Sequence, residues 1–182
     1  MPYEPPPELA ALTLAEIAAQ VAARKLPPIE QWTPARDGDS HMRITADGTW
    51  LHEGSPITRT AMVRAFSSLL TRDADGAHWL VTPHERLAIA VDDAAFIAVD
   101  AVRKGGGIAF RLNTDDLVVA GADHPLRATG NTETPALYLG VRGGLEARLN
   151  RSTYAQLAEI ALAEGEDWSV TSMSARFSLI PE

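Results

Sequence analysis

The stretch on which the fold prediction depends is GSPITRTAMVRAFSSLL, residues 54–70, in which Arg59 lies between two threonines just before an apolar helical stripe. A second stretch, EARLNRSTYAQLAEIAL, residues 146–162, repeats this arrangement, with Arg151 between two small polar residues. Apolar residues spaced at i, i+3, i+4 and i+7 are typical of an amphipathic helix. Each stretch therefore predicts a helix that begins beside an arginine.

The chain before each of these helices reads as two short strands around a glycine-containing turn, in MRITADGTWLHEG (residues 42–54) and in ALYLGVRGGLEAR (residues 136–148). The repeated unit is strand, turn, strand, arginine and helix. This repetition predicts an internal duplication. Because that order of elements is common in proteins, chance similarity of the two units is the alternative.

Three helices are expected. The first runs over about residues 13–25, with Thr13 as its N-cap and a proline pair at its end. The second follows the GSP turn. The third covers residues 152–164, in which Thr153 and Gln156 have capping-box spacing.

From residue 78 onward the sequence changes to short apolar strands separated by turn residues. Seven strands are predicted before the third helix: HWLVT, RLAIAV, FIAVDAVR, GIAFRLN, DLVVA, ALYLGV and LEARL. The longest break between them, residues 121–135, is polar and is predicted to be a mobile loop. One or two further strands are expected in WSVTSMSARFSLI, residues 168–180.

Composition argues against several classes of function. The formal net charge is −8 and the pI about 5.1, so we expect no basic surface for nonspecific nucleic-acid binding or for docking on anionic membranes. The absence of cysteine excludes disulfides, thiolate metal sites and a cysteine nucleophile. The N-terminal segment lacks the basic start of a signal peptide, and no apolar run reaches the roughly 20 residues that span a bilayer. We expect a cytoplasmic protein with neither nucleic acid nor membrane as partner.

A cation in the first turn of a helix is unfavourable by about 0.3–1 kcal/mol, because it meets the positive end of the helix dipole. Arg59 and Arg151 therefore need an acidic partner or a bound anion. Two interpretations remain open. In the first, each arginine forms a salt bridge across the two repeated units, with Asp47, Glu53 or Glu146. In the second, the guanidinium and the helix N–H groups bind a phosphate or carboxylate.

No catalytic or metal-binding motif is evident. The five histidines are scattered and lack the HxH or HExxH spacing of a metal site. DADG, residues 73–76, lacks the later ligands of a calcium loop, and the glycines of RKGGGIAF lack Rossmann spacing, so no cofactor is expected. One rival interpretation is a hydrolase of a phosphorylated metabolite that uses His84 or His52 with Asp92. Another is a protein-interaction module without an enclosed pocket.

Three segments carry a resemblance to a known family: LVTPHERLAIAVDDAAFIAVDA (residues 80–101), DGTWLHEGSPITR (47–59) and GLEARLNRSTYAQL (144–157). Together they resemble the bacterial family called domain of unknown function 1285, over about residues 31–163. The resemblance implies a duplicated two-part fold, a pleckstrin-homology-like C-terminal barrel, a site between the parts for a nucleotide-like molecule, and a signalling role. Seven strands followed by one helix agree with such a barrel, which the helix would cap.

The sequence thus predicts an α+β protein with an N-terminal part at residues 1–76 and the barrel at residues 77–182. The predicted function is non-enzymatic binding of a small anionic, nucleotide-like ligand between the two parts, in bacterial signalling. The oligomeric state stays open. The expected ligand-binding residues lie at the two helix starts, on the strands beside them and in nearby loops: Arg59, Arg151, Arg148, Trp50, Trp32 and His84.

Overall fold

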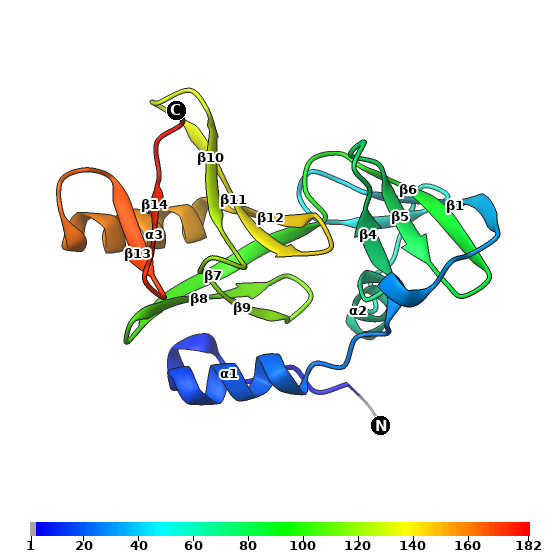
Figure 1. Ribbon diagram of the computed structural model, residues 1–182, viewed down its shortest axis with the longest axis horizontal. Helices are drawn as coiled ribbons and strands as arrows, with labels where there is room; N and C mark the ends of the chain where they lie inside the picture. The colour runs from blue at the N-terminus through cyan, green and yellow to red at the C-terminus, as the bar shows by residue number, and fades with distance from the viewer. Residues whose placement is uncertain (1–2) are drawn as a thin grey trace. The chain divides into compact units, whose positions relative to one another are not determined.

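The computed structural model describes residues 3–182, which form two compact units (Figure 1). The N-terminal unit comprises Tyr3, residues 25–95 and residues 142–145. All other described residues belong to the C-terminal unit. Each unit contains one six-stranded sheet together with helices, so the α+β class is confirmed.

The N-terminal unit is a mixed sheet in the order β3-β2-β1-β6-β5-β4. Neighbouring strands are antiparallel except at the centre, where β1 and β6 run parallel from Arg36 opposite Glu85 to Ile44 opposite Val91. The elements of this unit are η2 (Ile29–Gln31), β1 (Arg36–Ile44), β2 (Trp50–His52), β3 (Ser55–Pro56), α2 (Thr60–Ser67), β4 (Leu70–Arg72), β5 (His78–Val81) and β6 (Glu85–Val91).

The C-terminal unit contains a curled six-stranded sheet in the order β10-β11-β12-β7-β8-β9, and a separate hairpin (Figure 1). At the centre of the sheet, β7 and β12 run parallel, with Phe96 opposite Ala147. The elements are η1 (Leu9–Ala11), α1 (Leu14–Ala23), β7 (Phe96–Lys104), β8 (Gly107–Leu112), β9 (Leu117–Val119), β10 (Leu126–Gly130), β11 (Pro135–Arg142), β12 (Leu145–Leu149), α3 (Arg151–Glu164), β13 (Ser169–Ser172) and β14 (Ala175–Ser178).

The two sheets share one topology. In each, the first and last strands of six pair in parallel at the centre, the second and third lie on one side, and the fifth and fourth lie on the other. Strands β1 to β6 thus correspond to β7 to β12 in order. The chain therefore contains a duplication, which supports the expectation of a repeated fold.

The predicted register of the duplication is wrong, however. Helix α2 lies between the third and fourth strands of its sheet, whereas α3 follows the sixth strand of the other. Arg59 and Arg151 therefore occupy places that do not correspond. The resemblance between the two sequence stretches arose because both contain two strands, a turn and a helix, although different strands of the repeat supply them.

The predicted seven-stranded barrel is also corrected. The first two of its seven strands, β5 and β6, pair with β4 and β1 and belong to the N-terminal sheet. The segment expected to be a mobile loop contains strand β10, which pairs with β11. The C-terminal sheet consequently has six strands rather than seven. The chain passes from the N-terminal unit to the C-terminal unit between Ala95 and Phe96.

The N-cap predicted for α1 is confirmed, whereas α3 begins differently from the prediction. Thr13 caps α1 as predicted, because its hydroxyl accepts a hydrogen bond from the Glu16 amide at 3.1 Å while the Glu16 carboxylate accepts one from the Thr13 amide. The N-cap of α3 is Asn150, which accepts a hydrogen bond from the Thr153 amide at 2.9 Å. The predicted capping box is therefore wrong. Gln156 instead bonds to Asp100 and Ala101 and joins α3 to β7.

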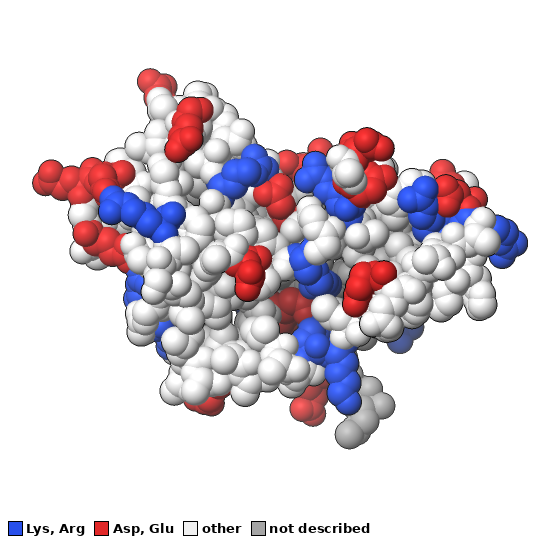
Figure 2. Space-filling model, viewed as in Figure 1, with Lys and Arg blue, Asp and Glu red and all other residues white. Residues whose placement is uncertain are grey.

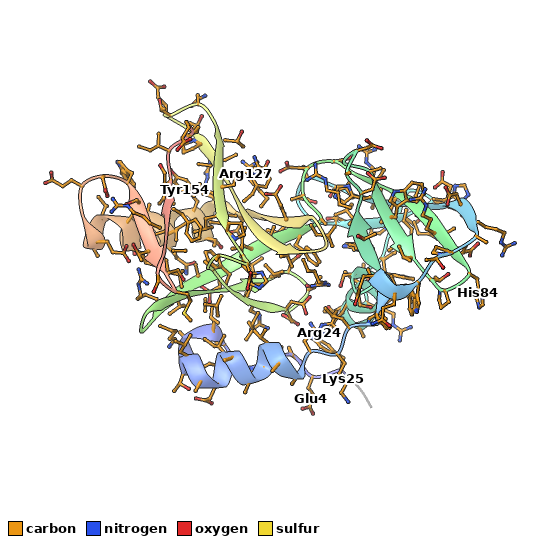
Figure 3. All side chains as sticks on the ribbon, in the orientation of Figure 1. Glu4, Arg24, Lys25, His84, Arg127 and Tyr154 are labelled. Carbon is orange, nitrogen blue, oxygen red and sulfur yellow. The ribbon has the colours of Figure 1, made fainter. Side chains whose placement is uncertain are left out.

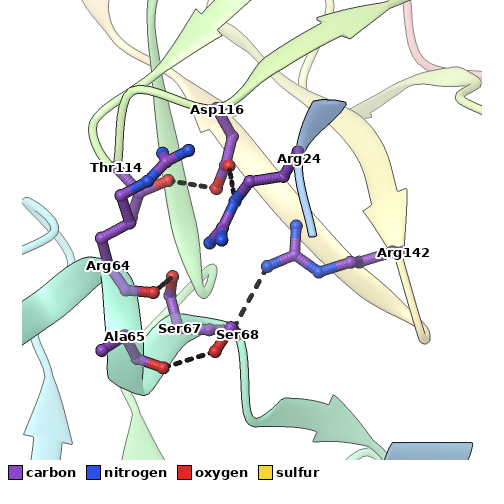
Figure 4. A network of polar contacts seen from close by, with 8 residues as sticks. All are labelled: Arg24, Arg64, Ala65, Ser67, Ser68, Thr114, Asp116 and Arg142. Atoms are coloured by element: carbon purple, nitrogen blue, oxygen red, sulfur yellow. Dashed lines mark hydrogen bonds and ion pairs between the residues drawn. The ribbon is translucent and has the colours of Figure 1, made fainter. Parts of the chain in front are cut away.

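The N-terminal arm, residues 4–24, contributes to the core of the C-terminal unit. Buried leucines of the arm and Ile17 of α1 pack against Ala109 and Leu117, and Figure 1 shows α1 lying along β8 and β9. At the end of α1, Arg24 donates to the carboxylate of Asp116 at 2.7 Å, and Asp116, which is 5% exposed, also accepts a hydrogen bond from Thr114 (Figure 4). In the part of the chain that is described, no helix is long and apolar enough to cross a membrane.

The turn between β13 and β14 contains two residues with left-handed backbones. Met173 (φ 49°) and Ser174 (φ 68°) connect the paired residues Ser172 and Ala175. A two-residue hairpin turn with positive φ at both positions favours Asn-Gly. Neither residue here is glycine, so the turn carries backbone strain of about 1–2 kcal/mol per residue.

We predict that Ser174→Gly stabilises the protein, because glycine adopts positive φ without strain. Since glycine also loses about 0.5–1 kcal/mol of chain entropy on folding, the net gain should be about 0.5–1 kcal/mol in the free energy of unfolding. Urea titration measures it. The matched control is Thr171→Gly on the neighbouring strand, which should be destabilising. If both variants lose stability alike, the strain is not present.

Candidate functional site

The N-terminal unit contains a groove of about 790 Å³. It lies between one face of the first sheet and the segment 26–34, which we call the strap. Ligand sites of small molecules commonly enclose about 300–1,000 Å³ and are lined mainly by apolar side chains. The strap groove has that size, and its strap side consists of Leu26, Pro27, Pro28, Ile29, Glu30, Trp32 and Pro34.

The strap takes its shape from its prolines. A proline fixes its own φ and disfavours helix in the residue before it, so a segment with Pro27, Pro28 and Pro34 cannot continue α1 and stays extended apart from the single turn η2. Its apolar side chains, among them Trp32, consequently lie over the sheet rather than on a helix.

The sheet side of the groove comes from β4, β5, β6 and β1. On β5, Trp79 and Val81 are two residues apart and share one face, whereas Leu80 faces the opposite side and is 4% exposed. Arg86 pairs in register with Val81 and also with Asp37 of β1, which brings the charged pair beside the tryptophan.

The indole of Trp79 is held from two directions. The Arg86 guanidinium lies 3.9 Å from the ring centroid, and the Asp37 carboxylate accepts two hydrogen bonds from Arg86, at 2.7 and 2.9 Å. The Trp79 Nε1–H donates to the Asp73 carboxylate at 2.9 Å. Two paired carboxylates thus fix one aromatic ring at the groove wall.

The pKa values of both carboxylates reflect these contacts. Hydrogen bonding from Arg86 lowers the pKa of Asp37, and the hydrogen bond from Trp79 is the main cause of the lowered pKa of Asp73. Both groups are therefore ionised at neutral pH, which keeps Arg86 and Trp79 in place.

A second arginine of the groove, Arg142, is the last residue of β11, directly before the turn to β12, and residues 142–145 belong to the N-terminal unit. It donates to the carbonyl of Ser67 at 3.2 Å (Figure 4), and the Gly143 carbonyl accepts a hydrogen bond from the Arg72 amide at 3.0 Å. Gly143 and Gly144 both have positive φ, and a Cβ on Gly144 would lie 3.2 Å from the Arg72 carbonyl. This double glycine therefore lets the turn place Arg142 at the groove.

The expected ligand-binding residues of the N-terminal unit lie in different surroundings. Trp32 lines the groove. Trp50 is 2% exposed and stacks on Phe66 of α2 at 6.4 Å, so it is a core residue. His84 is exposed in the turn between β5 and β6, and Arg59 is the exposed N-cap of α2 (His84 is labelled in Figure 3). Neither His84 nor Arg59 lines the groove.

The other two expected residues belong to the C-terminal unit. Arg151 is exposed in the first turn of α3. Within residues 3–182, neither Arg59 nor Arg151 forms an ion pair, so the salt-bridge interpretation is not supported for either residue. Arg148 donates to the hydroxyl of Tyr138 at 3.1 Å and lies 5.3 Å from its ring centroid.

Most residues that line the groove were not predicted from the sequence. Trp79, Arg86, Asp37, Asp73 and Arg142 come from segments distant in sequence, which only the sheet brings together. The alternation in HWLV does place Trp79 and Val81 on the same face. It does not reveal which strands supply the neighbouring charges.

Asp92, the carboxylate of the hydrolase hypothesis, is paired with an arginine and not with a histidine. Asp92 accepts a hydrogen bond from Arg43 Nε at 2.7 Å, and His52 and His84 are both exposed. Across the described residues 3–182, no group of three or more His, Asp or Glu side chains could hold a metal ion.

These features define a two-unit α+β protein built on a duplicated six-stranded sheet. Two family models match the chain, the N-terminal domain of DUF1285 over residues 27–94 and the C-terminal domain of DUF1285 over residues 95–179. The chain belongs to the DUF1285 family, whose function is unknown. Among curated proteins, none matches this chain.

Two solved structures resemble the protein. A DUF1285 family protein from Silicibacter pomeroyi DSS-3 is 39% identical, with a TM-score of 0.77 over 91% of this chain and 94% of the other. One from Shewanella baltica OS155 is 23% identical, with a TM-score of 0.54 over 65% of this chain and 90% of the other. The second likeness concerns the fold alone.

We predict that the groove keeps its geometry from neutral pH down to about pH 4 and loosens in more acidic solution. The folded pKa values of Asp37 and Asp73 lie below the ordinary 3.8, so their stabilising contribution is present above that value and is lost as pH falls through the folded pKa. The fluorescence difference between the wild type and Trp79→Phe isolates the Trp79 signal. A transition near pH 6–7 instead would contradict the assignment to carboxylates.

Proposed function

We propose that the protein is a non-enzymatic binding module for a small anionic, nucleotide-like ligand, and that the strap groove of the N-terminal unit is its binding site. The observation that carries the proposal is the Trp79 ring, which Arg86 and Asp73 hold at the wall of a mainly apolar groove of about 790 Å³. A signalling role follows from the family resemblance and belongs to the same proposal.

The apolar walls favour a ligand with a flat body. Tryptophan offers a large rigid surface that stacks on planar groups, and Trp32 and Trp79 both line the groove. Because Asp73 and Arg86 hold the Trp79 ring in place, binding against it costs little conformational entropy. A heteroaromatic base fits these walls better than a sugar or a flexible chain.

The charges limit the anionic part to a single group. Arg86 is neutralised by Asp37, and Arg142 brings a second guanidinium to the groove, whereas Glu30 and Asp73 bring negative charge. A triphosphate would meet repulsion from these carboxylates. One phosphate or carboxylate near Arg142 is the arrangement that the charges favour.

We therefore expect a nucleoside monophosphate such as AMP to stabilise the protein in a thermal-shift assay, and ATP to do so less. A ligand at about 100 times its Kd raises stability by roughly 2.7 kcal/mol. Trp79→Leu and Arg142→Gln should each abolish the shift. Trp168→Leu, which removes an exposed tryptophan of the C-terminal unit, is the matched control and should preserve it.

Equal shifts in the wild type, Trp79→Leu and Arg142→Gln would place the ligand outside the groove. Conversion of AMP to adenosine during incubation, followed by chromatography, would indicate a hydrolase instead of a binding module. Circular dichroism of each variant establishes that the fold is retained.

A further inference from the structure

Beyond the strap groove, we propose that Arg127, Tyr138 and Arg148 of the C-terminal unit form a second site, which binds the oxyanion of a phosphate group. The three residues lie on the adjacent strands β10, β11 and β12. Neither the groove nor its ligand is needed for this inference.

Two guanidinium groups converge on one aromatic ring. The Arg127 Cζ lies 4.6 Å and the Arg148 Cζ 5.3 Å from the ring centroid of Tyr138, whose hydroxyl accepts a hydrogen bond from Arg148 at 3.1 Å. Tyr138 is 8% exposed, so its ring is packed within the protein. An anion placed against both guanidinium groups would be attracted by both.

Glu146 of β12 positions one of the two arginines. Its carboxylate accepts hydrogen bonds from Arg127 Nε and Nη2, each at 3.0 Å. The Arg127 side chain is nevertheless 51% exposed. In Figure 2, basic and acidic groups lie next to each other where Figure 3 labels Arg127. A carboxylate in this position both orients the guanidinium and competes with an incoming anion.

The duplicated sheet allows the surroundings of Tyr138 to be compared with those of Trp79. Strands β5 and β6 hold the same place in the first sheet as β11 and β12 in the second, and both pairs carry an aromatic ring beside an arginine, Trp79 with Arg86 and Tyr138 with Arg148. The register partner of Trp79 on β4 is Thr71, whereas that of Tyr138 on β10 is Arg127. The second unit therefore adds a guanidinium where the first has a hydroxyl.

The geometry of the donors identifies the class of ligand. Planar guanidinium groups bind oxyanions through paired N–H donors, and two of them match an anion with three terminal oxygens better than a halide. The ligand is thus a phosphate, either inorganic phosphate or the phosphate of an ester. Phenyl phosphate distinguishes the two. It binds more tightly than inorganic phosphate only if the site also contacts the group esterified to the phosphate.

The test is an NMR titration of the full-length ¹⁵N-labelled protein with inorganic phosphate, and separately with phenyl phosphate, at constant ionic strength against chloride. We expect shifts of the arginine Nε–H signals and of the amides of β10–β12. Arg127→Gln and Arg148→Gln should each weaken phosphate binding by about tenfold. Arg43→Gln, which removes an arginine of similar exposure from the N-terminal unit, should leave it unchanged.

Glu146→Gln separates a binding site from a structural ion pair. If the site is real, loss of the competing carboxylate strengthens phosphate binding even if the fold becomes less stable. Tighter phenyl phosphate than phosphate binding supports the site with an ester ligand, and equal binding supports it with the free anion. Loss of phosphate affinity in Glu146→Gln, or equal affinity in the wild type, Arg127→Gln and Arg43→Gln, would overturn the proposal.

Discussion

The parallel pairing of the first and last strands of each sheet is the constraint on which the rest of the structure depends. Two parallel neighbours cannot be joined by a hairpin, because the chain must return to the same end of the sheet before the second strand begins. In both units it does so by passing through four other strands. β1 pairs with β6 and β7 with β12 only after the chain has run out to one edge and come back from the other.

This pairing determines which side chains meet. It places Asp37 of β1 beside Arg86 of β6, and Arg86 in turn fixes the ring of Trp79. The corresponding strands of the second sheet carry Tyr138 and Arg148. Each of the two sheets thus has an aromatic ring next to a guanidinium group. The neighbours differ, since the first unit has one arginine at the ring, paired with Asp37, whereas the second has two, of which Arg127 is paired with Glu146.

Local sequence signals located most elements but not their partners. Apolar periodicity predicted α1, α2 and α3, and short apolar runs between turn residues predicted β5 through β9 together with β11 and β12. Strand β10 was missed because its sequence, LRATG, lies in a polar segment that contains glycine and proline. Neither signal reports which strand a segment will join, so β5 and β6 were placed with the strands that follow them in sequence.

The candidate site was less predictable for the same reason. Trp32 was expected from its residue type, but Asp37, Trp79 and Arg142 meet only through long-range pairing. Arg59 and Arg151 were predicted to bind an anion because a cation at a helix start is unfavourable. Their exposure explains why it is tolerated, since water screens the unfavourable interaction.

Hydrogen–deuterium exchange with and without AMP tests the central claim, that the strap groove is where the protein binds its ligand. We expect saturating AMP to slow exchange in the strap, residues 26–34, and in β5 and β6, which lie on the two sides of the groove. Protection confined to α3 and to the β13–β14 hairpin, with the strap unchanged, would contradict it.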